Sequence, residues 1–370
     1  MRGERPTVAD IRLSAIRANF AFAARLAGVR EVISVIKADG YGHGAVAVAG
    51  ALVAAGCSQL AVVTVAEALV LRDAGISVPI LVLGGVHDAA GADAAIARGV
   101  VPVVQRTDQV ELLAARARAA GVPAHAQVEV DTGMRRMGVS DADAAALVAK
   151  LAGESQLTLD GVFSHFAQAD EPDLGPSLEQ VRRFRAVLAE LRERDIAPGQ
   201  VHMANSAALM AGSELADALP EATAVRPGLM LYGVRPAPHL PGELQAAMRL
   251  HTRVVQVRRV DTGESVGYGA TWRAPEAGWI ATLPIGYADG IPVANSNRGR
   301  VLLGGRSAEI VGRVSMDFIT VSAASEPSIG DEAELFGPEL PVEEVAARAD
   351  TIAYSLLIAV GPRVPRVICD

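Results

Sequence analysis

The lysine that ends an apolar run is the residue of this chain best placed to do covalent chemistry. The run SVIKADGYGHG covers residues 34 to 44, where β-branched residues lead to Lys37 and then to a Gly-rich turn. A cation is seldom buried at the end of an apolar strand unless it is paired or chemically used. A lysine that loses its proton there becomes a nucleophile toward an aldehyde. A lysine that merely extends its charged end to solvent is the alternative.

Several other polar residues also follow apolar runs. Asp131, His165 and the pair Asn205 and Ser206 each come at or just after the end of a β-branched segment. Eight such segments alternate with helix-like stretches, at 32–37, 60–64, 80–85, 100–105, 126–130, 159–165, 200–205 and 224–233. Alternating strands and helices indicate parallel βα units, and eight units predict a (β/α)8 barrel. An open, doubly wound sheet is the alternative architecture.

A closed barrel would bring these polar residues together. The carboxyl ends of its strands share one mouth, where barrel enzymes place their chemistry and often hold phosphate in the last two loops. Lys37, His165 and Asn205 are therefore expected to meet at that mouth.

The sequence pattern changes after about residue 240, where short strand-like segments separated by turn-forming residues follow one another closely. We therefore predict a barrel domain over residues 1–240 and a mainly β domain over residues 241–370. A single helix is expected in the second domain, at 341–350, and residues 6–13 could add a strand to it.

Composition favours an enzyme acting on a small molecule. The 370 residues carry a formal charge of -8, which argues against nucleic-acid and anionic-membrane partners. The two cysteines, Cys57 and Cys369, suggest neither a disulfide framework nor a metal site. The N-terminus lacks the pattern of a signal peptide, and turn-like residues interrupt the uncharged stretch 44–66, so we expect no membrane span and a cytoplasmic protein.

The segment VIKADGYGHG at 35–44 resembles the signature of the alanine racemase family. The resemblance implies that Lys37 carries pyridoxal 5'-phosphate covalently and that Tyr41 contacts the phosphate. Further family motifs follow in the expected order along nearly the whole chain.

Racemisation needs two bases, because a proton leaves one face of the α carbon and another returns to the opposite face. Lys37 could serve one face. Tyr268 in SVGYGATW, at 265–272, resembles the tyrosine of the second catalytic motif of the family. A phenol is ordinarily a poor base at neutral pH, so a nearby cation or desolvation must tune it. A turn tyrosine packed beside two glycines is the alternative.

The segment VRPGLMLYG at 225–233 resembles the part of the family that supplies an arginine, here Arg226, to the pyridine nitrogen. A guanidinium can only donate, so the ring becomes a weaker electron sink than one paired with aspartate. Prompt reprotonation at the α carbon is then favoured over transamination. His165 in FSHFA matches the histidine that orients this arginine, although an ordinary strand-end histidine is the alternative. For the cofactor and its phosphate the resemblance implies Tyr41, Asn205, Ser206, the amides of Gly228 and Leu229, and Tyr354.

The segment VEVDTGMRRMG at 128–138 resembles the strand end that places Arg136 near the substrate carboxylate and the catalytic tyrosine. Many members have a carbamylated lysine where this chain has Glu129, and our hypothesis is that the Glu129 carboxylate replaces it. A strand glutamate facing solvent is the alternative. Arg135 and Ser355 also depart from the family pattern and leave the side-chain preference for the substrate open.

Family members are homodimers in which each active site takes the tyrosine from the partner chain. The resemblance therefore implies that Tyr268 acts across the interface. Met316 and Asp317 would enter from the partner in the same way, with the Met316 amide near the substrate carboxylate, and Tyr287 is a further candidate for substrate binding. The family often has cysteine at the position of Ser315.

These motifs predict a pyridoxal phosphate racemase that interconverts L- and D-alanine, acts as a homodimer and supplies D-alanine for peptidoglycan. The alternatives are the same chemistry on serine or another small amino acid, a noncatalytic pyridoxal phosphate-binding protein, and a decarboxylase of related barrel fold.

Overall fold

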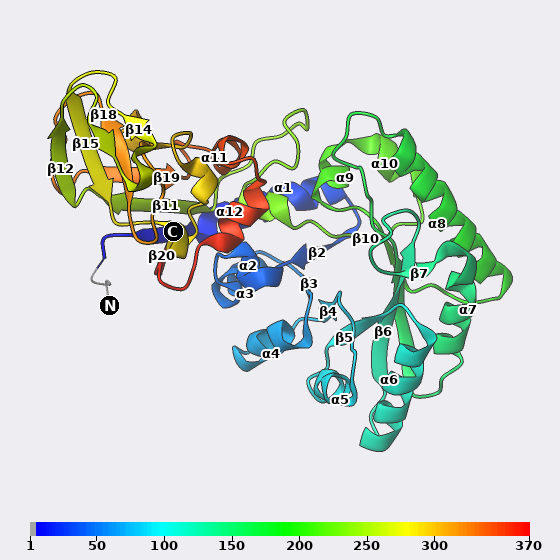
Figure 1. Cartoon of the computed structure of the whole chain (residues 1–370). Coiled ribbons are helices and arrows are strands. Elements are labelled where there is room, and N and C mark those ends of the chain that lie inside the picture. Colours follow the sequence, from blue (N-terminus) through cyan, green and yellow to red (C-terminus); the bar gives the residue numbers. More distant parts are fainter. Residues whose placement is uncertain (1–4) are drawn as a thin grey trace.

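The chain folds into a barrel and an appended β domain. In a computed structural model that describes residues 5–370, the barrel lies at the right of Figure 1 and the β domain at its upper left. Among the described residues, no helix combines the length and the apolar character needed to cross a bilayer.

Eight parallel strands close the barrel. They are β2 (Glu31–Val35), β3 (Gln59–Val62), β4 (Ile80–Val82), β5 (Val101–Val104), β6 (Ala124–Asp131), β8 (Leu157–Phe163), β9 (Gln200–His202) and β10 (Ala224–Val225). Closure is complete because β10 pairs with β2 and β5 pairs with β6, both in parallel. The short strand β7 (Val139–Ser140) pairs with the end of β6. The predicted (β/α)8 barrel is thus confirmed.

Most residues of the barrel strands are apolar, and they are buried on both faces. All four residues of β3 and all four of β5 are buried, as expected for strands covered by helices outside and side chains inside. The helices of this part are α1 (Leu13–Ala27), α2 (Lys37–Tyr41), α3 (Ala45–Ala54), α4 (Val65–Asp73), α5 (Ala89–Ala97), α6 (Thr107–Ala120), α7 (Asp141–Ala152), α8 (Gly175–Glu193), α9 (Ser206–Met210) and α10 (Ser213–Ala218).

The β domain is built on a sheet with the strand order β17-β16-β19-β11-β1-β20. Its strands are β1 (Val8–Arg12), β11 (Met248–Arg253), β16 (Arg300–Leu303), β17 (Arg306–Glu309), β19 (Glu332–Phe336) and β20 (Arg366–Cys369). Because β1 pairs with both β11 and β20, the first and last strands of the chain join one sheet, where they lie side by side. A second sheet and a hairpin complete the domain with β12 (Gln256–Val260), β15 (Gly278–Leu283), β18 (Ile319–Ala323), β13 (Ser265–Val266) and β14 (Trp272–Arg273).

Two details of the sequence prediction are wrong. The eighth barrel strand stops at Val225, because Pro227 has no amide hydrogen to donate and Gly228 bends the chain into a 3-10 helix at Leu229–Tyr232. The β domain has a second helix, α12 (Ala353–Ala359), after the expected α11 (Val342–Arg348). Helix α12 packs beside α2 at the junction of the two parts (Figure 1), which brings a β-domain helix to the mouth of the barrel.

Candidate active site

A cavity of about 750 Å³ opens at the carboxyl ends of the barrel strands. Eleven of the residues singled out from the sequence line it, namely Lys37, Tyr41, Glu129, Arg136, His165, Asn205, Ser206, Arg226, Gly228, Leu229 and Tyr354. Tyr354 comes from α12 and the others come from the barrel. The structure thus places these eleven residues around one space.

The backbone turns left-handed directly after Lys37. Ala38, Asp39, Gly40 and Tyr41 have φ values of 52°, 53°, 63° and 52°. Left-handed backbone costs about 1–2 kcal/mol for a residue with a Cβ, so other contacts must hold this turn. Glu67 provides one of them, because its Oε1 accepts the Ala38 amide at 2.7 Å while its Oε2 accepts the amide of Val63 at 2.8 Å. The turn aims Lys37 and Tyr41 into the same cavity.

The environment of Lys37 makes its ammonium group easier to deprotonate. Burial lowers the pKa of Lys37, and the positive charge of Arg136 lowers it further, whereas Glu67 acts in the opposite direction. A neutral amine can act as a nucleophile and as a proton acceptor. The site therefore supports the chemistry expected of this lysine.

Arg226 lines the cavity and is only 3% exposed. Its Nη2 donates to the carbonyl of Ser164 at 2.7 Å and to Nδ1 of His165 at 3.2 Å, and its Nη1 donates to Nδ1 of His202. Burial and the charge of Arg226 lower the pKa of His165 to about 3, so this imidazole is a neutral acceptor. Burial also lowers the pKa of Arg226, to about 10, which still leaves the guanidinium charged at neutral pH.

An anion cradle lies between the last two barrel strands and the left-handed turn. The Ser206 hydroxyl accepts the Gly228 amide at 2.9 Å, and a Cβ on Gly228 would stand 2.5 Å from the Tyr41 hydroxyl. The backbone can approach an oxyanion closely here because glycine has no side chain. The hydroxyls of this cradle suit a phosphate, the Lys37 amine suits an aldehyde and the donor Arg226 suits a pyridine nitrogen, and these are the groups that pyridoxal 5'-phosphate carries.

We expect Gly228→Ala to weaken cofactor binding at least roughly tenfold, the equivalent of one lost hydrogen bond to the phosphate. The added Cβ would displace the Tyr41 hydroxyl and narrow the cradle. Titration of the apoprotein with pyridoxal phosphate, followed by absorbance, measures the Kd. Gly50→Ala is the control, because a Cβ there meets nothing within 4 Å. A Kd equal to that of the wild-type protein would contradict the cradle.

Glu129 is buried rather than facing solvent, with 8% of its surface exposed. Its Oε2 accepts a hydrogen bond from the side-chain amide of Gln105 at 3.0 Å. Burial raises the pKa of the Glu129 carboxyl, whereas the positive charges of Arg226 and Arg136 lower it. The alternative of a solvent-facing glutamate is therefore wrong. Arg136 itself is exposed at the mouth of the cavity, where a substrate carboxylate could reach it.

Four residues singled out from the sequence lie apart from this cavity in the chain. Tyr268, Tyr287 and Met316 are 72%, 45% and 51% exposed on the β domain, and Asp317 lies next to Met316. None of the four is among the residues that line the cavity.

A buried carboxylate links the segments that carry Tyr287 and Asp317. Asp289 accepts two hydrogen bonds from Arg5, at 2.9 and 2.8 Å, and lies 3.3 Å from Nε of Arg363, which in turn donates to Asp317 at 2.7 Å. The amide of Tyr287 also donates to the carbonyl of Ser315 at 3.0 Å. These contacts hold the segments around Tyr287 and Asp317 together.

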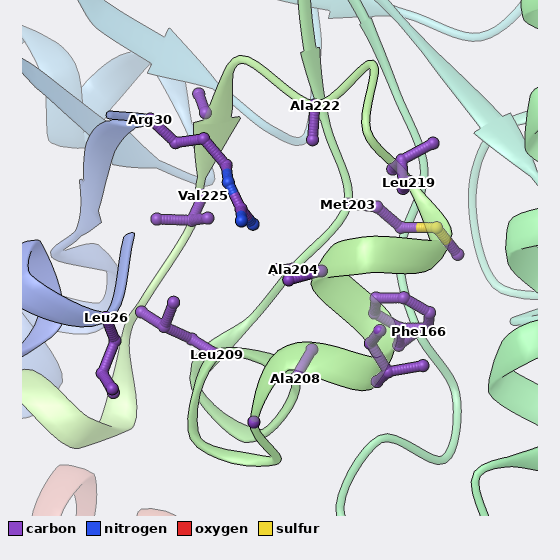
Figure 2. A pocket seen from close by; sticks show the side chains of 14 residues that line it. Leu26, Arg30, Phe166, Met203, Ala204, Ala208, Leu209, Leu219, Ala222 and Val225 are labelled. Carbon is purple, nitrogen blue, oxygen red and sulfur yellow. The ribbon is translucent and has the colours of Figure 1, made fainter. Parts of the chain in front are cut away.

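Two further cavities have different chemistry. The cavity in Figure 2 has room for little more than one water molecule, about 30 Å³, and Arg30 extends into it among aliphatic side chains such as Leu209 and Val225. A larger one, about 810 Å³, lies beside the candidate site and shares Tyr354 and Asp170 with it. Neither is lined by Lys37.

Buried histidines should make the fold sensitive to acid. His43 is fully buried and donates from Nδ1 to the Tyr41 carbonyl at 2.9 Å, and burial lowers its pKa to about 4. In the unfolded chain a histidine takes up a proton near pH 6.5, so acidification below that pH favours unfolding. We expect His43 to remove about 2 kcal/mol of unfolding free energy between pH 7.5 and pH 5.

Urea denaturation at the two pH values tests this expectation. His43→Leu should lose less stability on acidification than the wild-type protein, and the exposed His239→Leu should lose the same amount. Equal losses in all three proteins would contradict it.

Comparisons with known proteins give a consistent result. The family described as alanine racemase, N-terminal domain, matches residues 11–236, and the alanine racemase C-terminal domain family matches residues 247–368. The alanine racemase of Desulfovibrio desulfuricans is 40% identical over 99% of both chains, and that of Desulforamulus reducens is 42% identical over 98% of both. The crystal structure of alanine racemase from Streptomyces lavendulae superposes with a TM-score of 0.92 at 36% identity, covering 100% of this chain and 98% of the other.

Proposed function

Because this chain belongs to the alanine racemase family, we propose that it interconverts L- and D-alanine with pyridoxal 5'-phosphate bound in the cavity around Lys37. The observation that carries the proposal is the meeting of an amine whose pKa is lowered, an anion cradle and a buried arginine donor in that one cavity.

The roles of the barrel residues follow from their positions. Lys37 would attach the cofactor and, once free of it, move a proton at its Nζ on one face of the substrate. The hydroxyls of Ser206 and Tyr41 and the Leu229 amide would hold the phosphate, and the Gly228 amide would join them by exchanging its Ser206 partner for a phosphate oxygen. Arg226 would donate to the pyridine nitrogen. When bound, pyridoxal 5'-phosphate supplies an electron-withdrawing ring that makes the α proton acidic.

The second base would be Tyr268 of a partner subunit. Within one chain Tyr268 is highly exposed and does not line the cavity, so it is available to a second copy. We propose a homodimer in which Tyr268, Tyr287, Met316 and Asp317 complete the site of the partner. With the division at residue 240, each site would then combine the barrel domain and Tyr354 of one chain with the β-domain residues of its partner.

Substrate assays test the proposed activity. The purified protein, incubated with pyridoxal phosphate and either L-alanine, L-serine or L-lysine, should form the D-enantiomer of alanine, as measured by chiral chromatography. A preference for serine would contradict the substrate assignment. Cofactor binding without racemisation of any substrate would favour a noncatalytic binding protein.

The relatives from Desulfovibrio desulfuricans and Desulforamulus reducens favour alanine over serine as the substrate, since both are named alanine racemase. A decarboxylase usually has an acidic partner for the pyridine nitrogen, whereas Arg226 occupies that place here. We further propose that the protein works in the cytoplasm, where D-alanine would supply peptidoglycan synthesis.

Glu129 would hold Arg136 in place through its buried carboxylate, as the carbamylated lysine is expected to do in other members. We expect Glu129→Gln, which keeps the shape and removes the charge, to lower kcat/KM for alanine roughly tenfold. Glu154→Gln at the surface is the control, because Glu154 pairs with exposed Arg118 away from the cavity. Kinetics unchanged in Glu129→Gln would disprove this role.

A further inference from the structure

Amide side chains fill the interior of the barrel near the amino ends of its strands. Barrel interiors are usually packed with aliphatic residues, but here Gln127 is 1% exposed and Gln59 is 8% exposed. In the strand register Gln127 lies opposite Gly161, and Gly161 lies opposite Gln200. These three residues therefore form one layer across β6, β8 and β9.

His202 lies in the next layer toward the cavity. It follows Gln200 by two residues on β9, so both side chains face the same side of the strand. His202 is fully buried and its ring stacks on Phe163 at a centroid distance of 4.8 Å. Because Arg226 donates to Nδ1 of His202, the ring proton must be on Nε2, and this proton is donated to Oε1 of Gln127 at 2.8 Å.

The hydrogen bonds continue to the far end of the barrel. Nε2 of Gln127 donates to Oε1 of Gln200 at 3.2 Å, and Nε2 of Gln200 donates to the carboxylate of Glu31 at 2.8 Å. Glu31 is exposed at the first residue of β2. The hydrogen bonds thus form a polar row that runs through Arg226, His202, Gln127, Gln200 and Glu31. Every bond in it is donated in the same direction, because the row begins at a guanidinium, which can only donate, and ends at a carboxylate, which can only accept.

Gly161 leaves the space that this polar row needs. A Cβ at Gly161 would stand 3.0 Å from Cδ of Gln127 and 2.7 Å from the Gln200 carbonyl oxygen. Without that atom, the Gln127 side chain crosses over β8 to reach Gln200 on β9. The row therefore depends on a strand position that has no side chain.

We propose that Gln127 is a positioning residue for Arg226, which it holds through His202. By accepting the Nε2 proton it fixes the imidazole with Nδ1 toward the guanidinium, so that Arg226 keeps its acceptor and its direction toward the cavity. If residue 127 could not accept this hydrogen bond, the buried Nε2–H of His202 would have no partner. An imidazole ring that rotates to find a new acceptor would then break its hydrogen bond with Arg226. The consequence for catalysis rests on the function proposed above, whereas the hydrogen bond itself does not.

Proton NMR of the apoprotein labelled with ¹⁵N-histidine tests the hydrogen bond directly. Among the seven histidines, His202 should give a sharp, slowly exchanging Nε2–H resonance, assigned by its absence in His202→Asn. We expect Gln127→Met to broaden this resonance or move it upfield, and Gln127→Glu, which restores an acceptor of the same length, to recover it. Gln59→Met is the control, since Gln59 contacts Gln200 only at a branch of the row, at 3.1 Å.

Cofactor affinity and kinetics test the link to Arg226. In Gln127→Met, pyridoxal phosphate should bind up to roughly tenfold more weakly and kcat should fall, with KM for alanine unchanged, while Gln127→Glu and Gln59→Met stay near the wild type. If Gln127→Met does not fold, Gln200→Met at the partly exposed end should give a smaller change in the same resonance. A His202 proton on Nδ1, or an Nε2–H resonance that is the same in Gln127→Met and the wild type, would overturn the proposal even if the protein proved not to be a racemase.

Discussion

Lys37→Ala should lower racemisation of alanine by at least roughly 10³-fold, because one substitution removes both the covalent attachment of the cofactor and one of two bases. The chain has only one other lysine, Lys150, whose Nζ pairs with Glu111 on the surface. Lys150→Ala removes the same side chain from the surface and serves as the control with unchanged activity.

The two lysines also make the attachment site simple to identify. Hydride reduction of the holoenzyme followed by peptide mass spectrometry should find the added mass of pyridoxal phosphate on the peptide that contains Lys37. Modification of the Lys150 peptide, or full activity in Lys37→Ala, would show that another group does this chemistry.

Tyr268→Phe is expected to lower racemisation roughly 10²- to 10⁴-fold while the cofactor still binds. The substitution removes one oxygen from a side chain that is 72% exposed in one chain, so the fold should persist. Because Lys37 remains, the variant should still exchange the α hydrogen of one enantiomer of alanine with deuterium oxide. Mass spectrometry of L- and D-alanine incubated separately measures this exchange. Exchange into both enantiomers at the wild-type rate would exclude Tyr268 as the second base.

The fold could be predicted because its signals are local. Runs such as those that became β3 and β5 are apolar on both faces, and helices separate them, which together indicate a barrel. The family was also identified correctly from the segment around Lys37. The sequence misplaced the end of the eighth strand because an apolar stretch continues past Pro227, and it missed α12 because a short helix near strands has a weak periodic signal.

Other parts of the site depend on contacts between distant residues. The sequence TVAE at 64–67 has the capping-box pattern that Thr64 and Glu67 form, but the contact of Glu67 with the Ala38 amide is not a local feature. His202, Gln127 and Asp289 were also missed, because their roles arise from strand register and from loops that meet across the β domain. Left-handed backbone at Ala38 likewise contradicts the preference of its residue type.

Mixing the two inactive variants, Lys37→Ala and Tyr268→Phe, tests the central claim most directly. If each site combines Lys37 of one chain with Tyr268 of the partner, a mixed dimer has one site with both residues intact. Random reassociation should then recover about a quarter of wild-type activity, since half of the dimers are mixed and each has one good site. Mixed dimers that form, as shown by mass spectrometry of the intact complex, and yet racemise no alanine would contradict a two-base site shared between subunits.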